Sequence, residues 1–517
     1  MNRLTNCAAE VEAARLRLAA LLHARPEWLC TRRGSGGGAI YELRRDACQL
    51  RLAGASLHLL FENEAGVHPW RINGWEVCGA TLRLAVTRRA GVERAILELV
   101  PRDSAAATKA VVAAAREAMC ERVARVACAE LGAGAKIESA RLSAGTRRGE
   151  PGRYARVLLT HARGRVAVTA PVVELGAQST DAFLASALIW FARLRESVRR
   201  GASARRLWLL APPRLAAATC ERLPLLRAEL RETIAVYEQD EARGSLMLRP
   251  TPTLKALLSA APRFARAAGM EPGALAARIV SLAPDAIDVV RARYGETLRF
   301  RGLAFARVRR VLGRECAWLG IEGASRRRLL GEEDWPELVR LVAELSVHRR
   351  ADAPNRRHAM YHAQPEAWLE SLLRREITRL DPGLIVAPVH AQFRVARESA
   401  SGARPVDLLA LRRDGRLVLI ELKVSEDAAH ALQGADYWRR VETQRLRGRL
   451  TEARLFGDAH IAPHPPLLYL VAPLLHFHRS FETLARALSP AIEIYPFDIN
   501  EDWRAGVRVA RRCHFNH

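Results

Sequence analysis

Apolar side chains recur at two different spacings along this chain of 517 residues. Between about residues 39 and 101 they alternate with polar ones in short runs, which is typical of strands joined by turns. In residues 1–24 and 105–131 they recur every three or four positions, which indicates helices. The pattern predicts a multidomain α/β protein with a β-rich N-terminal domain.

The same pattern divides the chain into four predicted domains. Residues 1–104 form the β-rich domain, whose role the sequence does not indicate, and residues 105–245 form an α/β domain. Residues 246–355 are expected to be a mostly helical, basic connector that ends in a polar linker. Residues 356–505 form a second α/β domain, with helices expected at 366–380 and 427–447.

The last domain contains a predicted β-hairpin with charged residues on its strands. Two apolar runs flank Asp414 and Gly415, a pair that favours a tight turn. A three-residue loop with glycine in the left-handed region would place Asp407 directly opposite Glu421, with Cβ atoms about 5 Å apart. Because side chains alternate along a strand, Lys423 would share that face. A two-residue loop would instead turn Asp407 to the other face.

Lys423 is unusual in this chain, because only four of its 81 basic residues are lysines. A lysine ammonium is compact, and its pKa shifts readily, so it can act beside a reacting water. Two carboxylates on apolar strands are costly to bury unless a cation lies between them. Few hard oxygen ligands suit Mg²⁺, which can polarise a phosphodiester and activate water. The alternative is a surface hairpin with a cross-strand ion pair.

The arrangement of Asp407, a turn, Glu421-x-Lys423 and a helix with Gln433 resembles the PD-(D/E)xK nuclease superfamily, especially its NucS-type and RecB-like domains. The resemblance implies a restriction-endonuclease-like mixed sheet flanked by helices. It implies Asp407, Glu421 and the Leu422 carbonyl as ligands of Mg²⁺, for which Mn²⁺ can substitute. It also implies that Lys423 positions the water and that Gln433 supports the site.

The family pattern also places an acidic residue on the preceding helix. Glu370 fits this role best, and Glu366, one helical turn earlier, is the alternate. A solvated helix carboxylate is the competing interpretation of Glu370. Tyr437 lies one turn beyond Gln433 on the same helix face. The chain departs from the family over residues 433–437, where NucS-like sequences have the hydrophobic stretch Gln-Leu-Leu-Arg-Tyr and this chain has Gln-Gly-Ala-Asp-Tyr. The added acid, Asp436, would change DNA contacts, so the subfamily stays open.

Residues 155–173 repeat the layout of residues 406–424 and align with them without gaps. Each segment is followed by a tryptophan-containing helix and a strand that ends in Ala-Pro. In this alignment the positions of Asp407, Glu421 and Lys423 are taken by Arg156, Ala170 and Val172. The first copy would be a degenerate nuclease domain, leaving one active site per chain. Nicking is then expected, with double-strand cleavage only in a homodimer. The alternative is two unrelated segments with generic strand patterns.

The formal net charge of +25 favours a polyanionic partner, namely nucleic acid. A GC-rich coding bias explains arginine over lysine but not the excess of bases over acids. The resemblance favours DNA over RNA. The candidate nucleic-acid contacts are Tyr437, Arg440, Arg326, Arg327 and Arg328, together with the basic cluster Arg307, Arg309, Arg310 and Arg314.

The nine cysteines are scattered without a Cys-x-x-Cys pair, which indicates a reducing cytoplasm. No apolar run reaches about 18 residues, so no membrane span is expected. The sequence therefore predicts a cytoplasmic, nucleoid-associated, Mg²⁺-dependent endodeoxyribonuclease. The competing predictions are a non-catalytic nucleic-acid-binding protein with the same fold, a nuclease that acts on RNA, and a structural assembly factor.

Overall fold

The computed structural model of the protein divides into two compact units. One comprises Met1–Ala177, Val198–Leu210 and Gln239–Met247, and the other comprises Gln178–Ser197, Ala211–Glu238 and Leu248–His517. The structure describes residues 2–4, 7–25, 27–34, 40–44, 48–63, 66–88, 91–145, 152–162, 164–172, 179–196, 203–240, 245–259, 272–292, 295–311, 314–321, 328–393 and 405–515. No helix among these residues is both long and apolar enough to cross a membrane.

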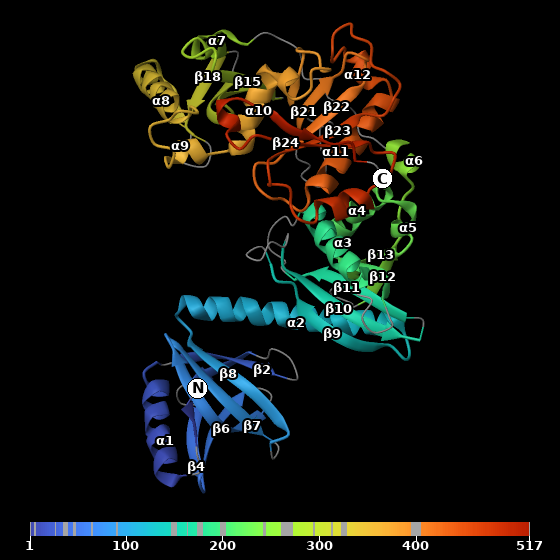
Figure 1. Ribbon diagram of the computed structural model, residues 1–517. Coiled ribbons are helices and arrows are strands. Elements are labelled where there is room, and N and C mark those ends of the chain that lie inside the picture. Colours follow the sequence, from blue (N-terminus) through green and yellow to red (C-terminus); the bar gives the residue numbers. More distant parts are fainter. Residues whose placement is uncertain are drawn as a thin grey trace. The chain divides into compact units, whose positions relative to one another are not determined.

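An eight-stranded antiparallel sheet forms the N-terminal domain, as the alternating sequence predicts (Figure 1). Its strand order is β3-β2-β8-β7-β6-β5-β4, and β1 pairs with β6. Helix α1 packs against it through Val11, Leu18 and Leu22, which share a core with Trp70 and Leu84. The elements are β1 (Asn2–Arg3), α1 (Ala8–His23), β2 (Glu27–Gly34), β3 (Ile40–Arg44), β4 (Cys48–Ala53), β5 (Ser56–Asn63), β6 (Gly66–Cys78), β7 (Thr81–Arg88) and β8 (Glu93–Pro101).

Two further sheets have six strands each and the same connectivity. The first has the order β9-β10-β11-β12-β13-β14, and the second has the order β20-β21-β22-β23-β24-β25. The first set is α2 (Ala105–Leu131), β9 (Lys136–Leu142), β10 (Tyr154–His161), β11 (Gly164–Pro171), α3 (Thr180–Glu196), β12 (Ala204–Ala211), α4 (Pro213–Cys220), η3 (Leu223–Leu225), α5 (Ala228–Arg231), β13 (Ile234–Asp240) and β14 (Ser245–Arg249).

The second set closes the chain. It is α10 (Pro365–Arg375), η5 (Ile377–Arg379), β20 (His390–Phe393), β21 (Val406–Leu411), β22 (Leu417–Leu422), α11 (His430–Leu446), α12 (Arg449–Glu452), β23 (Leu467–Pro473), α13 (Phe481–Ala487), β24 (Ile494–Ile499), η6 (Trp503–Ala505) and β25 (Val509–Arg512). In each set a helix precedes the first strand, two antiparallel pairs follow, and a helix crosses over to a parallel strand. This common layout supports the predicted duplication.

The gapless alignment of the two hairpins is wrong by one residue. His161 pairs with Gly164, so the β10–β11 loop has two residues, whereas Gly415 closes a three-residue loop between β21 and β22. Arg156 consequently lies opposite Thr169. The counterparts of Glu421 and Lys423 are therefore Thr169 and Pro171, not Ala170 and Val172. Neither can ligate a metal as a carboxylate does, so the predicted loss of the site is unaffected.

The connector was expected to be mostly helical, and this is wrong for the described residues between 287 and 329. They form a five-stranded antiparallel sheet in the order β15-β16-β17-β18-β19. Its strands carry buried and partly buried residues in runs too short to separate from a helical pattern by spacing alone. The elements are α6 (Leu254–Ser259), α7 (Ala274–Val280), β15 (Ile287–Ala292), β16 (Gly295–Phe300), β17 (Leu303–Val311), β18 (Arg314–Leu319), β19 (Arg328–Leu329), η4 (Glu332–Asp334), α8 (Trp335–His348) and α9 (Ala359–His362).

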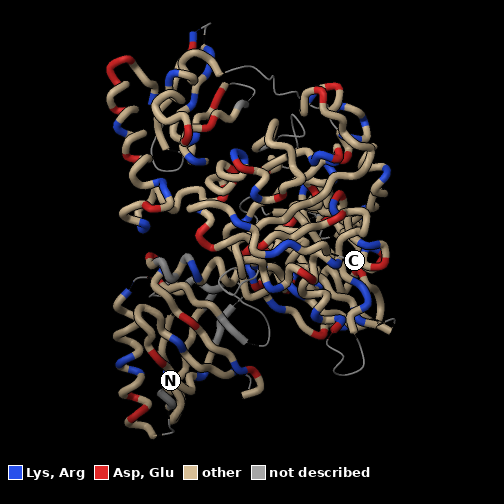
Figure 2. Tube along the Cα trace, turned by 45° about the horizontal axis from the view of Figure 1, so that its top comes forward, with Lys and Arg blue, Asp and Glu red and all other residues tan. Residues whose placement is uncertain are grey.

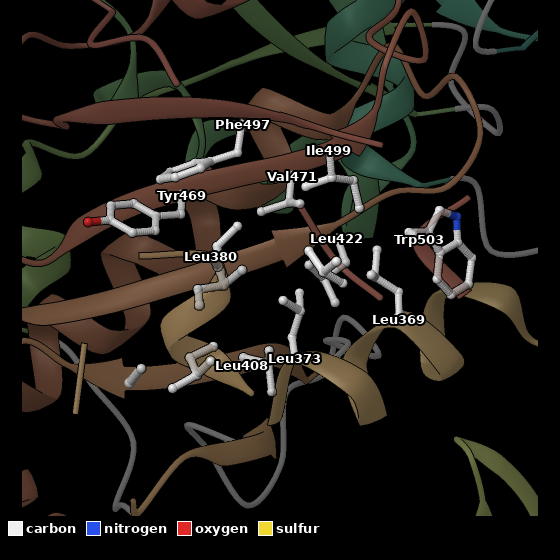
Figure 3. Close-up of a cluster of buried hydrophobic side chains, with 14 of the residues drawn as sticks. Leu369, Leu373, Leu380, Leu408, Leu422, Tyr469, Val471, Phe497, Ile499 and Trp503 are labelled. Atoms are coloured by element: carbon white, nitrogen blue, oxygen red, sulfur yellow. The ribbon is translucent and has the colours of Figure 1, made fainter. Parts of the chain in front are cut away.

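The C-terminal sheet is covered on both faces. Leu369 and Leu373 of α10 face Leu408 and Leu422 of the strands in one core (Figure 3). On the opposite face α11 approaches β23 closely at Gly434, where an added Cβ would lie 2.9 Å from a methyl group of Leu470. Strands buried on both sides carry continuous apolar runs, as β22 and β23 do. Charged residues on such strands must therefore find partners inside the domain.

The predicted register of the β21–β22 hairpin is confirmed. Leu408 pairs with Ile420 and Leu411 with Leu417, which places Asp407 opposite Glu421. The turn is closed by the Gly415 N–H, which donates to the Arg412 carbonyl at 2.9 Å. Gly415 has a φ of +82°, in the left-handed region where glycine is favoured.

We expect Gly415→Ala to destabilise the protein more than Gly457→Ala. Both glycines have left-handed backbones, so each substitution costs about 1–2 kcal/mol in strain. Only at Gly415 would the new Cβ also lie 2.8 Å from a backbone oxygen, that of His460. Chemical denaturation of both variants tests this, and equal losses of stability would show that the turn has no special constraint.

Candidate active site

Glu421 and Lys423 lie at the end of β22 and form a buried ion pair. The Lys423 ammonium donates to Glu421 Oε1 at 2.7 Å and lies 3.4 Å from the Leu422 carbonyl oxygen. Glu421 is 1% exposed and Lys423 is 6% exposed. The Lys423 N–H donates to the Val471 carbonyl on the parallel strand β23, which extends the sheet past the site. The backbone thus holds both charged groups in a fixed place.

Asp407 completes the pair of strand carboxylates that the sequence predicted. Its Oδ2 accepts a hydrogen bond of 2.9 Å from the Leu422 N–H across the hairpin. The charge of Asp407 acts on both Glu421 and Lys423. The structure therefore brings the three predicted strand residues together.

The third carboxylate comes from α10, but it is Glu366 and not Glu370. Glu366 accepts a hydrogen bond from the Val424 N–H, and its charge acts on Lys423. Glu370 is also buried, yet its Oε2 faces Arg299 of β16 at 3.7 Å. The preference for Glu370 is therefore corrected. Arg299, which faces Glu370, lies in the five-stranded sheet. The alternate, Glu366, is the residue whose charge acts on Asp407 and Lys423.

Helix α11 covers the site with polar groups. The Gln433 amide donates to the Tyr437 hydroxyl at 2.9 Å, one helical turn away. Burial raises the pKa of Tyr437, and the charge of Glu421 adds to this, so the phenol stays protonated. Sequence reasoning missed His430, whose Nε2–H donates to the Glu421 carbonyl at 3.2 Å. Burial and the Lys423 charge lower the pKa of His430 to about 3, so it is neutral.

The electrostatics of the site favour an added cation. Burial raises the pKa of Glu421 well above its usual range, and the charge of Asp407 raises it further. Burial opposes the charge on Lys423, but Glu421, Glu366 and Asp407 outweigh this and raise its pKa. With all three carboxylates ionised, the site would carry two excess negative charges around one ammonium, and this repulsion contributes to the raised pKa values of Glu421 and Glu366.

One buried oxygen of the site also lacks a partner. Glu421 Oε2 makes no hydrogen bond among the described residues. A buried acceptor without a partner is rare in folded proteins. The unpartnered oxygen and the two excess negative charges fit a hard divalent ion with oxygen ligands.

The surroundings of three candidate nucleic-acid contacts, Tyr437, Arg440 and Arg328, do not favour that role. Tyr437 is 4% exposed, so its ring cannot stack on a base from outside. Arg440 pairs with Asp436 at 2.5 Å, and Arg328 pairs with Glu337. Arg326 and Arg327 lie outside the described residues. Arg307, Arg309, Arg310 and Arg314 lie on strands β17 and β18 and not on helices.

Asp436, the acid that sets this helix apart from the sequence pattern of the PD-(D/E)xK resemblance, is the centre of a buried ionic network. It lies 3.1 Å from Arg222, which follows α4, and 2.7 Å from Arg439. Arg222 also contacts Asp181 of α3 at 3.0 Å. Burial opposes the ionisation of Asp436, but Arg222, Arg440 and Arg439 hold its pKa below the usual range. Helix α11 is thereby tied to the segment that follows the first hairpin.

A second group of possible metal ligands lies on α8 and α9. Ligand atoms of Glu344, His348 and His358 lie within 4.8 Å of one another. The two imidazole rings, however, stack with centroids 3.8 Å apart and an interplanar angle of 10°. Lone pairs in two parallel stacked planes do not converge on one ion. The carboxylate cluster on β21, β22 and α10 is therefore the better candidate site.

No family model matches the chain, and no curated protein matches it. One solved structure with some similarity is described as "Structure of EndoMS-dsDNA2 complex". The match covers 39% of this chain and 83% of that one at 16% sequence identity, with a TM-score of 0.13. A TM-score this low carries no argument about this protein.

The contribution of Glu421 and Glu366 to the stability of the metal-free protein should fall as the pH rises above the ordinary carboxyl pKa. Glu421 and Glu366 have raised pKa values when folded, so their contribution is present below the ordinary carboxyl pKa and is lost above it. Mg²⁺ should restore stability, more so at higher pH. Thermal melts in EDTA and in Mg²⁺ test this, with Asp407→Asn expected to flatten the pH dependence. Identical pH profiles with and without Mg²⁺ would contradict it.

Arg222→Met should destabilise the protein by about 3–5 kcal/mol, because it leaves Asp181 and Asp436 buried without their shared cation. Adding Asp181→Asn should recover part of the loss. The control is Arg486→Met, which removes an exposed arginine paired only with the exposed Glu482. Chemical denaturation measures all three, and equal effects at Arg222 and Arg486 would refute a structural role for the network.

Proposed function

We propose that this protein is a metal-dependent nuclease of the PD-(D/E)xK type that hydrolyses phosphodiester bonds in DNA. The observation that carries the proposal is the buried Glu421–Lys423 pair, with Asp407 directly opposite and Glu421 Oε2 unpartnered. A purely structural ion pair gains little from two further carboxylates beside it, since excess buried negative charge is costly. A site that recruits a cation explains all of these groups together.

Asp407 and Glu421 would hold Mg²⁺ or Mn²⁺, with the Leu422 carbonyl and Glu366 as further oxygen ligands. When bound, the ion supplies Lewis-acid polarisation of the phosphodiester and lowers the pKa of a coordinated water. Glu366 joins this set because its charge acts on Lys423, Asp407 and Glu421, whereas Glu370 is committed to Arg299. The ligand set is thus three carboxylates and one carbonyl from three elements.

Lys423 would act as a fixed cation, because its ammonium is held 2.7 Å from Glu421 Oε1 at the end of β22. From there it can orient the attacking water and neutralise charge on the phosphate. Gln433 and Tyr437 brace the site from α11, with the Tyr437 proton available to the carboxylates whose charges act on it. His430 holds the Glu421 backbone in place.

The first α/β segment is a degenerate copy that keeps the fold without the chemistry. Arg156 and Thr169 lie opposite each other where Asp407 and Glu421 do in the second copy. Parallel pairing matches as well, since Thr169 pairs with Leu209 as Glu421 pairs with Leu470. One chain would therefore carry one active site and nick duplex DNA. The net charge of +25 supports a nucleic-acid substrate, and basic residues occur along the whole described chain (Figure 2).

We expect Asp407→Ala and Lys423→Ala to abolish Mg²⁺-dependent cleavage, with losses of at least 100-fold, as is typical for groups that stabilise charge in the transition state. Glu366→Gln should also reduce cleavage strongly, whereas Glu370→Gln should spare it. The assay uses supercoiled plasmid, linear duplex, single-stranded and branched DNA with Mg²⁺ or Mn²⁺. On supercoiled plasmid the first product should be the nicked circle.

The competing function is a binding module that retains the fold. Binding of DNA without metal-dependent cleavage of DNA or RNA, indifferent to Asp407→Ala and Lys423→Ala, would establish it and overturn the nuclease. Cleavage of RNA alone, lost in the same variants, would change the substrate and keep the mechanism. Equal cleavage by Glu366→Gln and Glu370→Gln would remove Glu366 from the site.

A further inference from the structure

A cavity of about 330 Å³ lies beside the second half of α10. Its wall comes from the turn between β16 and β17, the segment after α8, and η6. The polar lining residues are Arg301, Arg350, Arg375, Arg504, Asp285, Asp352 and Ser371. Four guanidinium groups against two carboxylates give the wall an excess of two positive charges. The cavity belongs to the same compact unit as the carboxylate site.

Only two of the four arginines make salt bridges among the described residues. Arg350 pairs with Asp352 at 3.2 Å, and Arg375 pairs with Asp288 at 3.0 Å. Arg301 instead donates to a backbone carbonyl at 2.9 Å. The Arg504 guanidinium lies over aromatic rings, 4.3 Å from that of Trp503, and its buried Nε makes no hydrogen bond in the described part of the chain.

The cavity is held in shape by packing on its rim. Gly302 has a φ of +84°, and a Cβ there would lie 2.0 Å from the Ala367 carbonyl oxygen of α10. The β16–β17 turn therefore packs directly on the helix backbone. Arg349 is fully buried and donates to five carbonyls around the same rim, those of Phe300, Arg301, Met360, Ala363 and Gln364. Its hydrogen bonds join the turn to the segment that begins α10.

We propose that this cavity binds a phosphate group of the nucleic-acid strand that enters the carboxylate site. This inference rests on the proposed function. The planar fork of a guanidinium matches phosphate oxygens, and neither Arg301 nor Arg504 makes a salt bridge in the described part of the chain. Burial lowers the pKa of both arginines and neighbouring arginines lower it further, whereas Asp352 raises that of Arg301 and Tyr361 raises that of Arg504.

The cavity and the carboxylate site are both reached from α10. Glu366 and Arg375 are nine residues apart on this helix, about 13 Å along its axis and two and a half turns, so their side chains leave it on opposite faces. A strand that contacts both places would pass around the helix, and 13 Å equals the axial rise of about four phosphates on one strand of duplex DNA. The cavity would grip the backbone a few nucleotides from the bond that is cut, without reading sequence.

The test is the salt dependence of DNA binding, measured on a duplex oligonucleotide without divalent ions. Each lost phosphate contact reduces the slope of log K against log salt by about 0.9. We expect this reduction in Arg504→Gln and in Arg301→Gln, with affinity lowered equally for unrelated sequences. Arg504→Lys should keep most of the slope. Arg486→Gln, which removes the same charge from an exposed ion pair, should leave the slope unchanged.

Unchanged slopes in both Arg504→Gln and Arg301→Gln, with both variants folded by thermal melt, would overturn the proposal. If Arg504→Gln fails to fold, Arg301→Gln and Arg504→Lys decide it. A second arm titrates inorganic phosphate and a nucleoside monophosphate into the wild type. Stabilisation lost in Arg301→Gln, with an unchanged DNA slope, would assign the cavity to a free phosphate ligand instead. Because binding is measured without metal, failure here is separate from failure of cleavage.

Discussion

The C-terminal domain depends on a buried ion pair that the strands around it cannot solvate. Taking Glu421 and Lys423 out of water costs several kcal/mol for each charge, and their mutual attraction offsets this only with good geometry and further polar partners. The register of the β21–β22 hairpin brings Asp407 to the pair, α10 brings Glu366, and α11 covers it. Two helices and three strands are thereby committed to one cluster. The excess negative charge that remains is what makes the cluster suited to a metal.

Residues of helix α10 contact two different parts of the protein. Glu366, near the start of α10, acts on the carboxylate cluster, while Glu370 and Arg375 reach the five-stranded sheet through Arg299 and Asp288. The five-stranded sheet, which the sequence predicted to be a helical connector, therefore packs against α10, the helix that carries the candidate ligand Glu366. The arginine-rich cavity lies at this junction. Substrate binding and ligand placement would depend on the same helix.

The two six-stranded sheets show how one topology can carry different residues at equivalent points. Arg156 and Thr169 occupy the opposed pair that Asp407 and Glu421 form in the second sheet, and both are buried. Asp436 is paired inside the protein, because Arg222 from the segment after the first hairpin lies 3.1 Å from it. The acid that the sequence suggested as a change in DNA contacts is therefore an internal connection.

The sequence by itself determined what neighbours along the chain control. The three-residue turn at Gly415 sets the hairpin register, and the helix at 105–131 matches its predicted limits, with Ser104 capping it by accepting from the Ala107 N–H at 3.2 Å. Only the tertiary structure decided between Glu366 and Glu370, which are one helical turn apart and have the same local pattern. It also decided that Tyr437 is buried, that Arg440 is paired, and that the described residues between 287 and 329 form strands. Those outcomes depend on residues distant in sequence, such as Arg299 beside Glu370 and Arg222 beside Asp436. The spacing of apolar residues along the chain does not indicate these contacts.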